Sequence, residues 1–187
     1  MGLLRTSLVF VALAAAAAAA ATSVAVAAPD PRSLALRLSD LPAGATLESE
    51  RSYSVAAWAK KRHLSPETVR ALGFVSGFER MAVGGSLTKP LVLSVEISVY
   101  RSERGPAREV ANGLALCHSN IGHELPLTVS LGDESYACRV DQAGYRTTLV
   151  FWRHGNVSAT VGVTSSSHAD QLPLASSLAQ KQDTRLA

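Results

Sequence analysis

The chain lacks clustered charge. Charged residues make up 18% of its 187 residues, and its formal net charge is only +3. The basic residues are scattered, and Lys60-Lys61-Arg62 is the only run of three. Because nucleic-acid binding needs a clustered basic stripe, we expect no nucleic-acid partner.

Motifs of enzymes and metal sites are also missing. The sequence has no Gly-x-Ser-x-Gly elbow and no phosphate-binding loop that ends in Gly-Lys-Ser/Thr. His118 and His123, beside Cys117, supply too few ligands for a tetrahedral zinc site. We therefore expect no cofactor, no metal and no identifiable catalytic residue.

The first part of the chain is almost without charge. Arg5 is the only charged residue before Asp30, an apolar run begins at Leu8, and Ala25-Val26-Ala27 offers the small residues that a signal peptidase reads. We predict a signal peptide over residues 1–27, a single α+β domain over 28–187, and a secreted or periplasmic location with no stable membrane span after cleavage. The alternative is a retained anchor, because the apolar run is long enough to cross a bilayer.

Cysteine is scarce. Cys117 and Cys138 are the only two in the sequence, and both lie beyond the predicted signal peptide. A cysteine pair in an exported protein predicts a disulfide bond. Two buried free thiols are the alternative.

The clearest positive feature of the sequence is a series of segments with the composition of β-strands. Three consecutive strands, over residues 135–140, 145–152 and 157–163, organise the sequence around them. They are rich in aromatic and β-branched residues, and Arg153-His154-Gly155-Asn156 suits a tight turn between the last two, with either His154-Gly155 or Gly155-Asn156 as a two-residue loop. Alternation of side chains through this turn predicts one core-facing set: Thr148, Val150, Trp152, Val157, Ala159, Val161 and Val163.

The opposite face of this hairpin mixes aromatic, aliphatic and hydroxyl side chains. Its prominent members are Tyr145, Leu149, Phe151 and Thr160. Because this surface is neither fully apolar nor fully polar, we expect ligand binding there. The alternative is a second layer of core beneath loops.

The remaining segments alternate between strand and helix patterns. Strand character is found over 46–54, at an expected sheet edge, and over 74–83 and 91–100; helical spacing is found over 55–63, 65–73, 106–118 and 173–186. Between Leu91 and Tyr100, the alternation predicts one buried and one largely wet face. The charged face of the helices between 55 and 72 is expected to be solvated. Together these patterns predict an α+β fold, an antiparallel sheet with helices packed mainly on one face.

Four short segments carry a family resemblance: Leu38–Gly44, Val95–Ser102, Leu131–Ser135 and Ala179–Asp183. With them the chain resembles uncharacterised exported α+β proteins of high-GC bacteria, and in outline it is similar to extracellular sensor domains and to the PsbP-like fold. The helices between 55 and 72 depart from that outline. The resemblance implies binding rather than catalysis.

We therefore expect a non-catalytic ligand-binding or sensor-like domain whose partner is an unknown small molecule or an envelope protein. An apolar pocket with converging polar groups would favour this function. A cell-envelope hydrolase is an alternative that requires a histidine within reach of a serine or carboxylate in a cleft. A structural or interaction protein of the envelope is another, and it would expose a contiguous apolar patch without a pocket.

The signal-peptide prediction is tested by the mass of the protein from its host's secreted fraction. We expect a mature chain that begins at Ala28, because cleavage follows the small residues at 25 and 27. An intact N-terminus in the mass spectrum would show instead that the segment is retained.

Overall fold

The computed structural model describes residues 28–86, 89–142, 144–166 and 169–187, so the predicted signal peptide lies outside the described residues. Within these residues the strands are β1 (Thr46–Tyr53), β2 (Phe74–Ser86), β3 (Lys89–Tyr100), β4 (Gly122–Leu125), β5 (Glu134–Gln142), β6 (Tyr145–His154) and β7 (Val157–Ser165). The helices are α1 (Pro31–Leu34), the 3-10 turn η1 (Leu38–Asp40), α2 (Val55–Lys61), α3 (Pro66–Ala71), α4 (Arg104–Cys117) and α5 (Leu172–Asp183).

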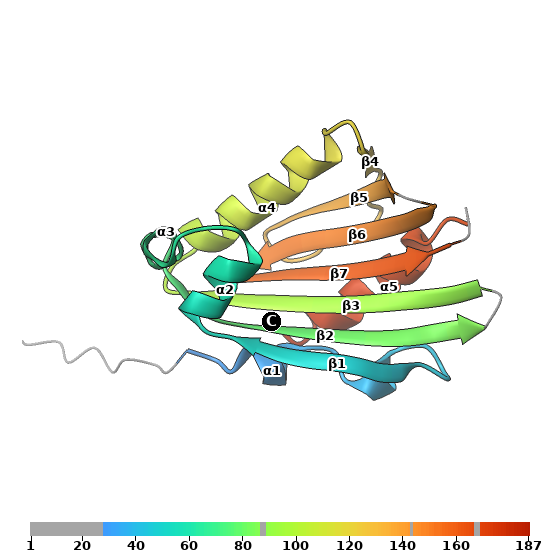
Figure 1. Ribbon diagram of the computed structural model, residues 1–187, viewed down its shortest axis with the longest axis horizontal. Coiled ribbons are helices and arrows are strands. Elements are labelled where there is room, and N and C mark those ends of the chain that lie inside the picture. The colour runs from blue at the N-terminus through green and yellow to red at the C-terminus, as the bar shows by residue number, and fades with distance from the viewer. Residues whose placement is uncertain (1–27, 87–88, 143, 167–168) are drawn as a thin grey trace, which may run out of the picture.

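The strands form one antiparallel sheet in the order β1-β2-β3-β7-β6-β5-β4 (Figure 1). It consists of two meanders, β1 to β3 and β4 to β7, which are joined along the ladder between β3 and β7. Helix α4 connects the two meanders in sequence. The α+β class and the antiparallel sheet are confirmed, and β1 lies at the sheet edge as predicted.

The β6–β7 hairpin has a two-residue turn, at the second of the two predicted positions. His154 pairs with Val157, which leaves Gly155-Asn156 as the loop, and Gly155 has a φ of +54° that favours glycine. The Gly155 N–H donates to the carboxylate of Asp133 at 2.7 Å. Asp133, in a pair of acids that opens β5, thus holds a turn.

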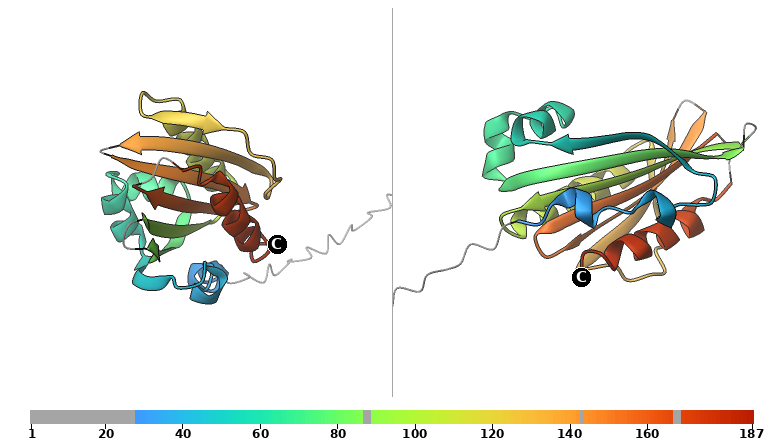
Figure 2. Two further views of the ribbon diagram at one scale, coloured as in Figure 1. Left: turned by 90° about the vertical axis from the view of Figure 1, so that its right-hand side faces the viewer. Right: turned by 90° about the horizontal axis from the view of Figure 1, so that it is seen from below.

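One face of the sheet packs against α1 and α5 and forms the main core (Figure 2). Every residue of the core-facing set predicted for the hairpin is buried. Trp152 is 0% exposed, and its indole N–H donates to Asp183 of α5 at 2.9 Å. The predicted core-facing set of the hairpin is therefore confirmed.

The opposite face is covered too, by α4 and by the α2–α3 pair. The helices are thus shared between both faces rather than packed mainly on one, which corrects that part of the prediction. The polar face of β3 is not wet either, since Ser98 and Tyr100 are each 1% exposed. The physical reason is that this face also carries large apolar side chains, Tyr100, Leu149 and Phe151 among them, which need cover.

A buried glutamine links α5 to the N-terminal segment. Gln182 is 0% exposed; its side-chain carbonyl accepts from the Leu36 N–H at 2.7 Å, and its amide donates to the Leu34 carbonyl. Both of its polar atoms are therefore paired with backbone groups, which lie 146 and 148 residues away in sequence.

Replacing this glutamine by leucine is expected to lower the free energy of unfolding by about 3 kcal/mol, because the buried Leu36 N–H and the partly buried Leu34 carbonyl lose their partners. Urea denaturation measures the change. The matched control is Gln180→Leu, an exposed glutamine on the same helix, for which we expect a change within about 0.5 kcal/mol. Equal losses in both variants would contradict the role of Gln182.

Candidate ligand-binding site

A cavity of about 490 Å³ lies between the sheet, α4 and the α2–α3 pair. Its floor comes from alternate residues of three adjacent strands: Ser94 and Glu96 of β3, Leu149 and Phe151 of β6, and Thr160 of β7. The volume falls within the range of about 300–1,000 Å³ that is typical of small-molecule sites. Apolar and polar groups therefore converge on a space large enough for a ligand.

Helix α4 forms one wall and lies close to the sheet at Gly113. A Cβ atom on this residue would stand 2.9 Å from the Phe151 ring, which is closer than such atoms approach. Glycine in a helix interior costs about 1 kcal/mol relative to alanine. Here it permits the contact that sets the distance between α4 and the cavity floor.

The opposite wall is fixed by aromatic packing. Trp58 of α2 stacks on Phe74 with ring centroids 5.1 Å apart, and Tyr53 meets it edge-on at 5.3 Å. The guanidinium of Arg62 lies 4.4 Å from the Trp58 ring centroid. Residues three and four positions apart share a helix face, so the anchored Trp58 directs Lys61 and Arg62 toward the sheet.

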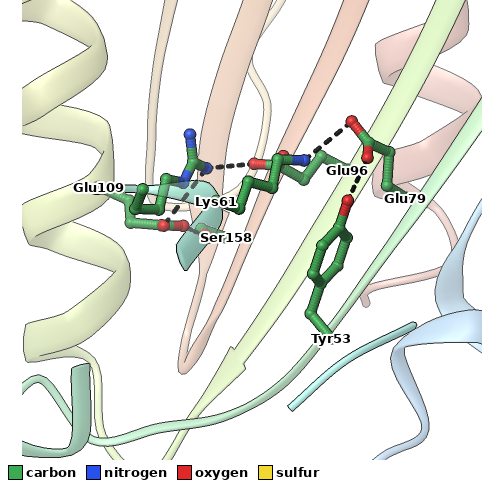
Figure 3. Close-up of polar contacts among 7 residues, drawn as sticks. Tyr53, Lys61, Glu79, Glu96, Glu109 and Ser158 are labelled. Carbon is green, nitrogen blue, oxygen red and sulfur yellow. Dashed lines mark hydrogen bonds and ion pairs between the residues drawn. The ribbon is translucent and has the colours of Figure 1, made fainter. Parts of the chain in front are cut away.

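These two cations enter a chain of charged groups that crosses the sheet (Figure 3). Glu79 and Glu96 are directly opposite each other on β2 and β3. Like charges in such a pair repel. The Lys61 ammonium lies between them, 2.8 Å from Glu79 and 2.5 Å from Glu96, and Arg62 bonds the other oxygen of Glu96.

The charge chain shifts the pKa values of its members. Burial works against the charged form of Lys61, but Glu96 and Glu79 outweigh it and raise the pKa of the amine. Burial also opposes ionisation of Glu79, yet Lys61 and the Tyr53 hydroxyl, which donates to Glu79 at 2.5 Å, lower the pKa of this carboxyl. The ionised pair is thus the stable form at neutral pH.

Glu109 of α4 behaves differently. Burial raises its pKa, and this effect exceeds the opposing influence of Arg62. The nearest guanidinium nitrogen of Arg62 is 3.6 Å away and bonds Glu96 more closely, while the Ser158 hydroxyl donates to Glu109. The positive charge near Glu109 is therefore too small to offset the cost of burying its carboxylate.

The structure brings together three of the four residues predicted to bind a ligand. Leu149, Phe151 and Thr160 all line the cavity. Tyr145 does not; it is 57% exposed at the start of β6. The covered surface predicted as an alternative is also present in part, because Phe151 packs with α4 in a small cluster of its own.

Sequence reasoning missed the charged wall of the cavity. The helices between 55 and 72 were expected to present a solvated charged face, whereas Lys61 and Arg62 pair with sheet carboxylates. The available signal was the spacing of Trp58, Lys61 and Arg62 on one helix face, together with Glu96 on the polar side of β3. Neither reveals that the two elements meet.

The predicted disulfide between Cys117 and Cys138 is wrong. Both cysteines are free thiols, 1% and 0% exposed, and they share an apolar cluster with Val140 and Phe151. Burial raises the pKa of the Cys117 thiol, which keeps it protonated. The pair packs α4 against β5 as apolar groups, as the alternative of two buried thiols described.

The histidines near the end of α4 form no composite site. His118 contacts Glu124 at 2.8 Å, with both side chains about half exposed, at 59% and 48%. This pair is outside the cavity, and none of the histidines that the structure describes lines it. Within the described ranges, no three histidine, cysteine or acidic residues gather closely enough to hold a metal ion.

Comparisons with known proteins give a fold but no family. No family model matches the chain, and neither does any curated protein sequence. Among solved structures, it is similar to the extracellular domain of PknH from Mycobacterium tuberculosis, with a TM-score of 0.51 over 82% of this chain and 94% of that chain. The sequences are 9% identical, so the likeness concerns the fold alone. In the part of the chain that the structure describes, no helix is long and apolar enough to cross a membrane.

The bridging role of Lys61 predicts a pH-dependent loss of stability in Lys61→Met. At pH 7 we expect a loss of about 2 kcal/mol, between the values typical of exposed and buried ion pairs. Because the folded-state pKa of Glu79 is lowered, its contribution is present above the ordinary glutamate value of 4.5 and is lost as the pH falls through the folded pKa. The contribution of Lys61, whose folded pKa is raised, is lost only above its ordinary value of 10.5.

Urea denaturation at pH 7 and pH 3 measures this difference. The gap between wild type and Lys61→Met is expected to shrink at pH 3. Lys60→Met, at the exposed neighbouring residue, is the matched control and should change little at either pH. A gap that is the same at both pH values would rule out the carboxylate bridge.

Proposed function

We propose that the chain is a non-catalytic, exported ligand-binding domain of the sensor-like kind, and that it takes a small molecule into the cavity between α4, α2–α3 and the sheet. The predicted signal peptide supports export. The likeness in fold to an extracellular domain is in keeping with this location.

The observation that carries the proposal is the cavity itself. It combines apolar walls with a few polar groups held in fixed positions by ion pairs, as small-molecule sites do. Two leucines that line it, Leu64 of the α2–α3 connection and Leu116 of α4, are 43% and 37% exposed. Exposed apolar side chains at a cavity are typical of a surface that a ligand covers.

The two alternative functions have less support. A hydrolase requires a histidine near a serine or a carboxylate in a cleft, and the His118–Glu124 pair is outside the cavity. An interaction protein of the envelope would expose an apolar patch in place of a pocket, whereas the exposed Leu64 and Leu116 belong to the pocket.

Native mass spectrometry of protein from the host's secreted fraction tests the proposal. We expect the wild-type chain to carry a small-molecule mass that is lost on denaturation. Thr160→Trp, which fills the cavity from its floor, should abolish this adduct while the chain stays folded by circular dichroism.

The matched control for this variant is Thr164→Trp. It lies on the same strand and the same face of the sheet, but outside the cavity lining, and it should keep the adduct. An adduct that survives in Thr160→Trp, or no adduct on the wild-type chain, would count against a ligand in this cavity.

A further inference from the structure

The ion-pair chain beside the cavity is unbalanced, because the remaining cation of the lining, Arg108, is exposed to water and is not part of the chain. The chain of ionic groups that crosses the sheet contains two cations, Lys61 and Arg62, and three carboxylates, Glu79, Glu96 and Glu109. With all five ionised, this cluster has a net charge of −1, which the raised pKa of Glu109 relieves by favouring its protonated form; a bound cation would take the place of that proton. An unbalanced charge is costly at a partly buried site, where water screens it less than at the surface.

The imbalance falls on one residue. Both oxygens of Glu79 have partners, in Lys61 and Tyr53, and both oxygens of Glu96 have partners, in Lys61 and Arg62. Glu109 has only the more distant contact with Arg62 as a source of positive charge.

The charged and polar groups that interact most strongly with Glu109 are Arg62, which caps the C-terminus of α2, Glu96 and Tyr100 of β3, and Ser158 of β7. Among them only Arg62 is a cation, and it is shared with Glu96. The Glu109 side chain is 19% exposed, so water solvates its charge only in part.

The rest of the cavity suits an apolar group. Leu116 of α4 and Leu149 and Phe151 of β6 line it, and none of them belongs to the ion-pair chain. One ligand can therefore place a charged end near Glu109 and an apolar end against these side chains.

We propose that the cavity binds an organic cation, such as a protonated amine with an apolar portion, and that Glu109 is its counter-ion. This inference rests on the proposed function and adds the chemical class of the ligand. The competing class is an organic anion held by Arg108, which also lines the cavity. The cation is favoured because Arg108 is exposed and fully solvated, whereas water reaches Glu109 only in part.

The test compares three probes that share one chain length and differ in charge: octylamine, octanol and octanoate. Isothermal titration calorimetry at pH 7 is expected to show octylamine binding about tenfold more tightly than octanol, a difference of about 1.4 kcal/mol. Octanoate is expected to bind most weakly. This ranking is measured on the wild-type chain, so it does not depend on the folding of any variant.

Glu109→Gln keeps the size of the side chain and removes its charge, and it should reduce octylamine binding about tenfold, to the level of octanol. The control is Glu48→Gln, which removes an exposed carboxylate on β1 outside the cavity and should leave octylamine binding unchanged. Tightest binding by octanoate, lost in Arg108→Gln, would overturn the proposal in favour of an anion.

The remaining outcomes separate this inference from the proposed function. If all three probes bind equally and Thr160→Trp abolishes their binding, the cavity is a binding site but the cation class is wrong. If none of the probes binds but the wild-type chain carries a native adduct that Thr160→Trp abolishes, the cation class is again wrong and the proposed function stands; the absence of both probe binding and an adduct overturns both proposals.

Discussion

A repulsion between two carboxylates governs how this molecule is arranged. Glu79 and Glu96 stand opposite each other on adjacent strands, and the ammonium of Lys61 separates them. A cation can reach this position only if α2 lies on the sheet, so the short α2–α3 pair is held against the strands instead of projecting into water. The same placement closes one side of the cavity. The contact of α2 with the sheet thus both neutralises the paired carboxylates and forms one wall of the cavity.

The two layers of the fold meet in strand β6. Phe151 points to the layer of α4 and supports it at Gly113, whereas its neighbour Trp152 is buried in the layer of α5 and bonds Asp183. A strand whose successive residues anchor different layers has no free face. This explains why the mixed composition of β6 gives neither a wet surface nor a plain core, and why it lies at the floor of a cavity.

Local pattern was enough to predict most elements and one entire face of the sheet. Alternation along β6 and β7 identified the buried set from Thr148 to Val163, because the side chains of a strand obey a strict period of two. The same alternation identified Leu149, Phe151 and Thr160 as one surface. Tyr145 shares their parity but not their position along the strand, and parity carries no information on position.

What remained hidden depends on contacts between distant segments. The pairing of Lys61 with Glu96 joins residues 35 apart in sequence, and that of Ser158 with Glu109 joins residues 49 apart. No periodicity within a helix or a strand can report such pairs. The cysteines show the opposite case, because Cys117 and Cys138 do lie in one cluster. Proximity does not decide between a disulfide bond and two packed thiols. The expected oxidising compartment predicted the bond, but both cysteines are free thiols.

The β3–β7 ladder that joins the two meanders constrains the order in which the chain can fold. β1, β2 and β3 are neighbours in sequence and can pair early, as can β5, β6 and β7, but β3 meets β7 only after the long segment between them has closed. The cavity has walls from α2 in the first half, from α4 in the connection, and from β6 and β7 in the second half. It therefore cannot exist until the halves have joined, and a molecule bound in it would, by mass action, hold them together.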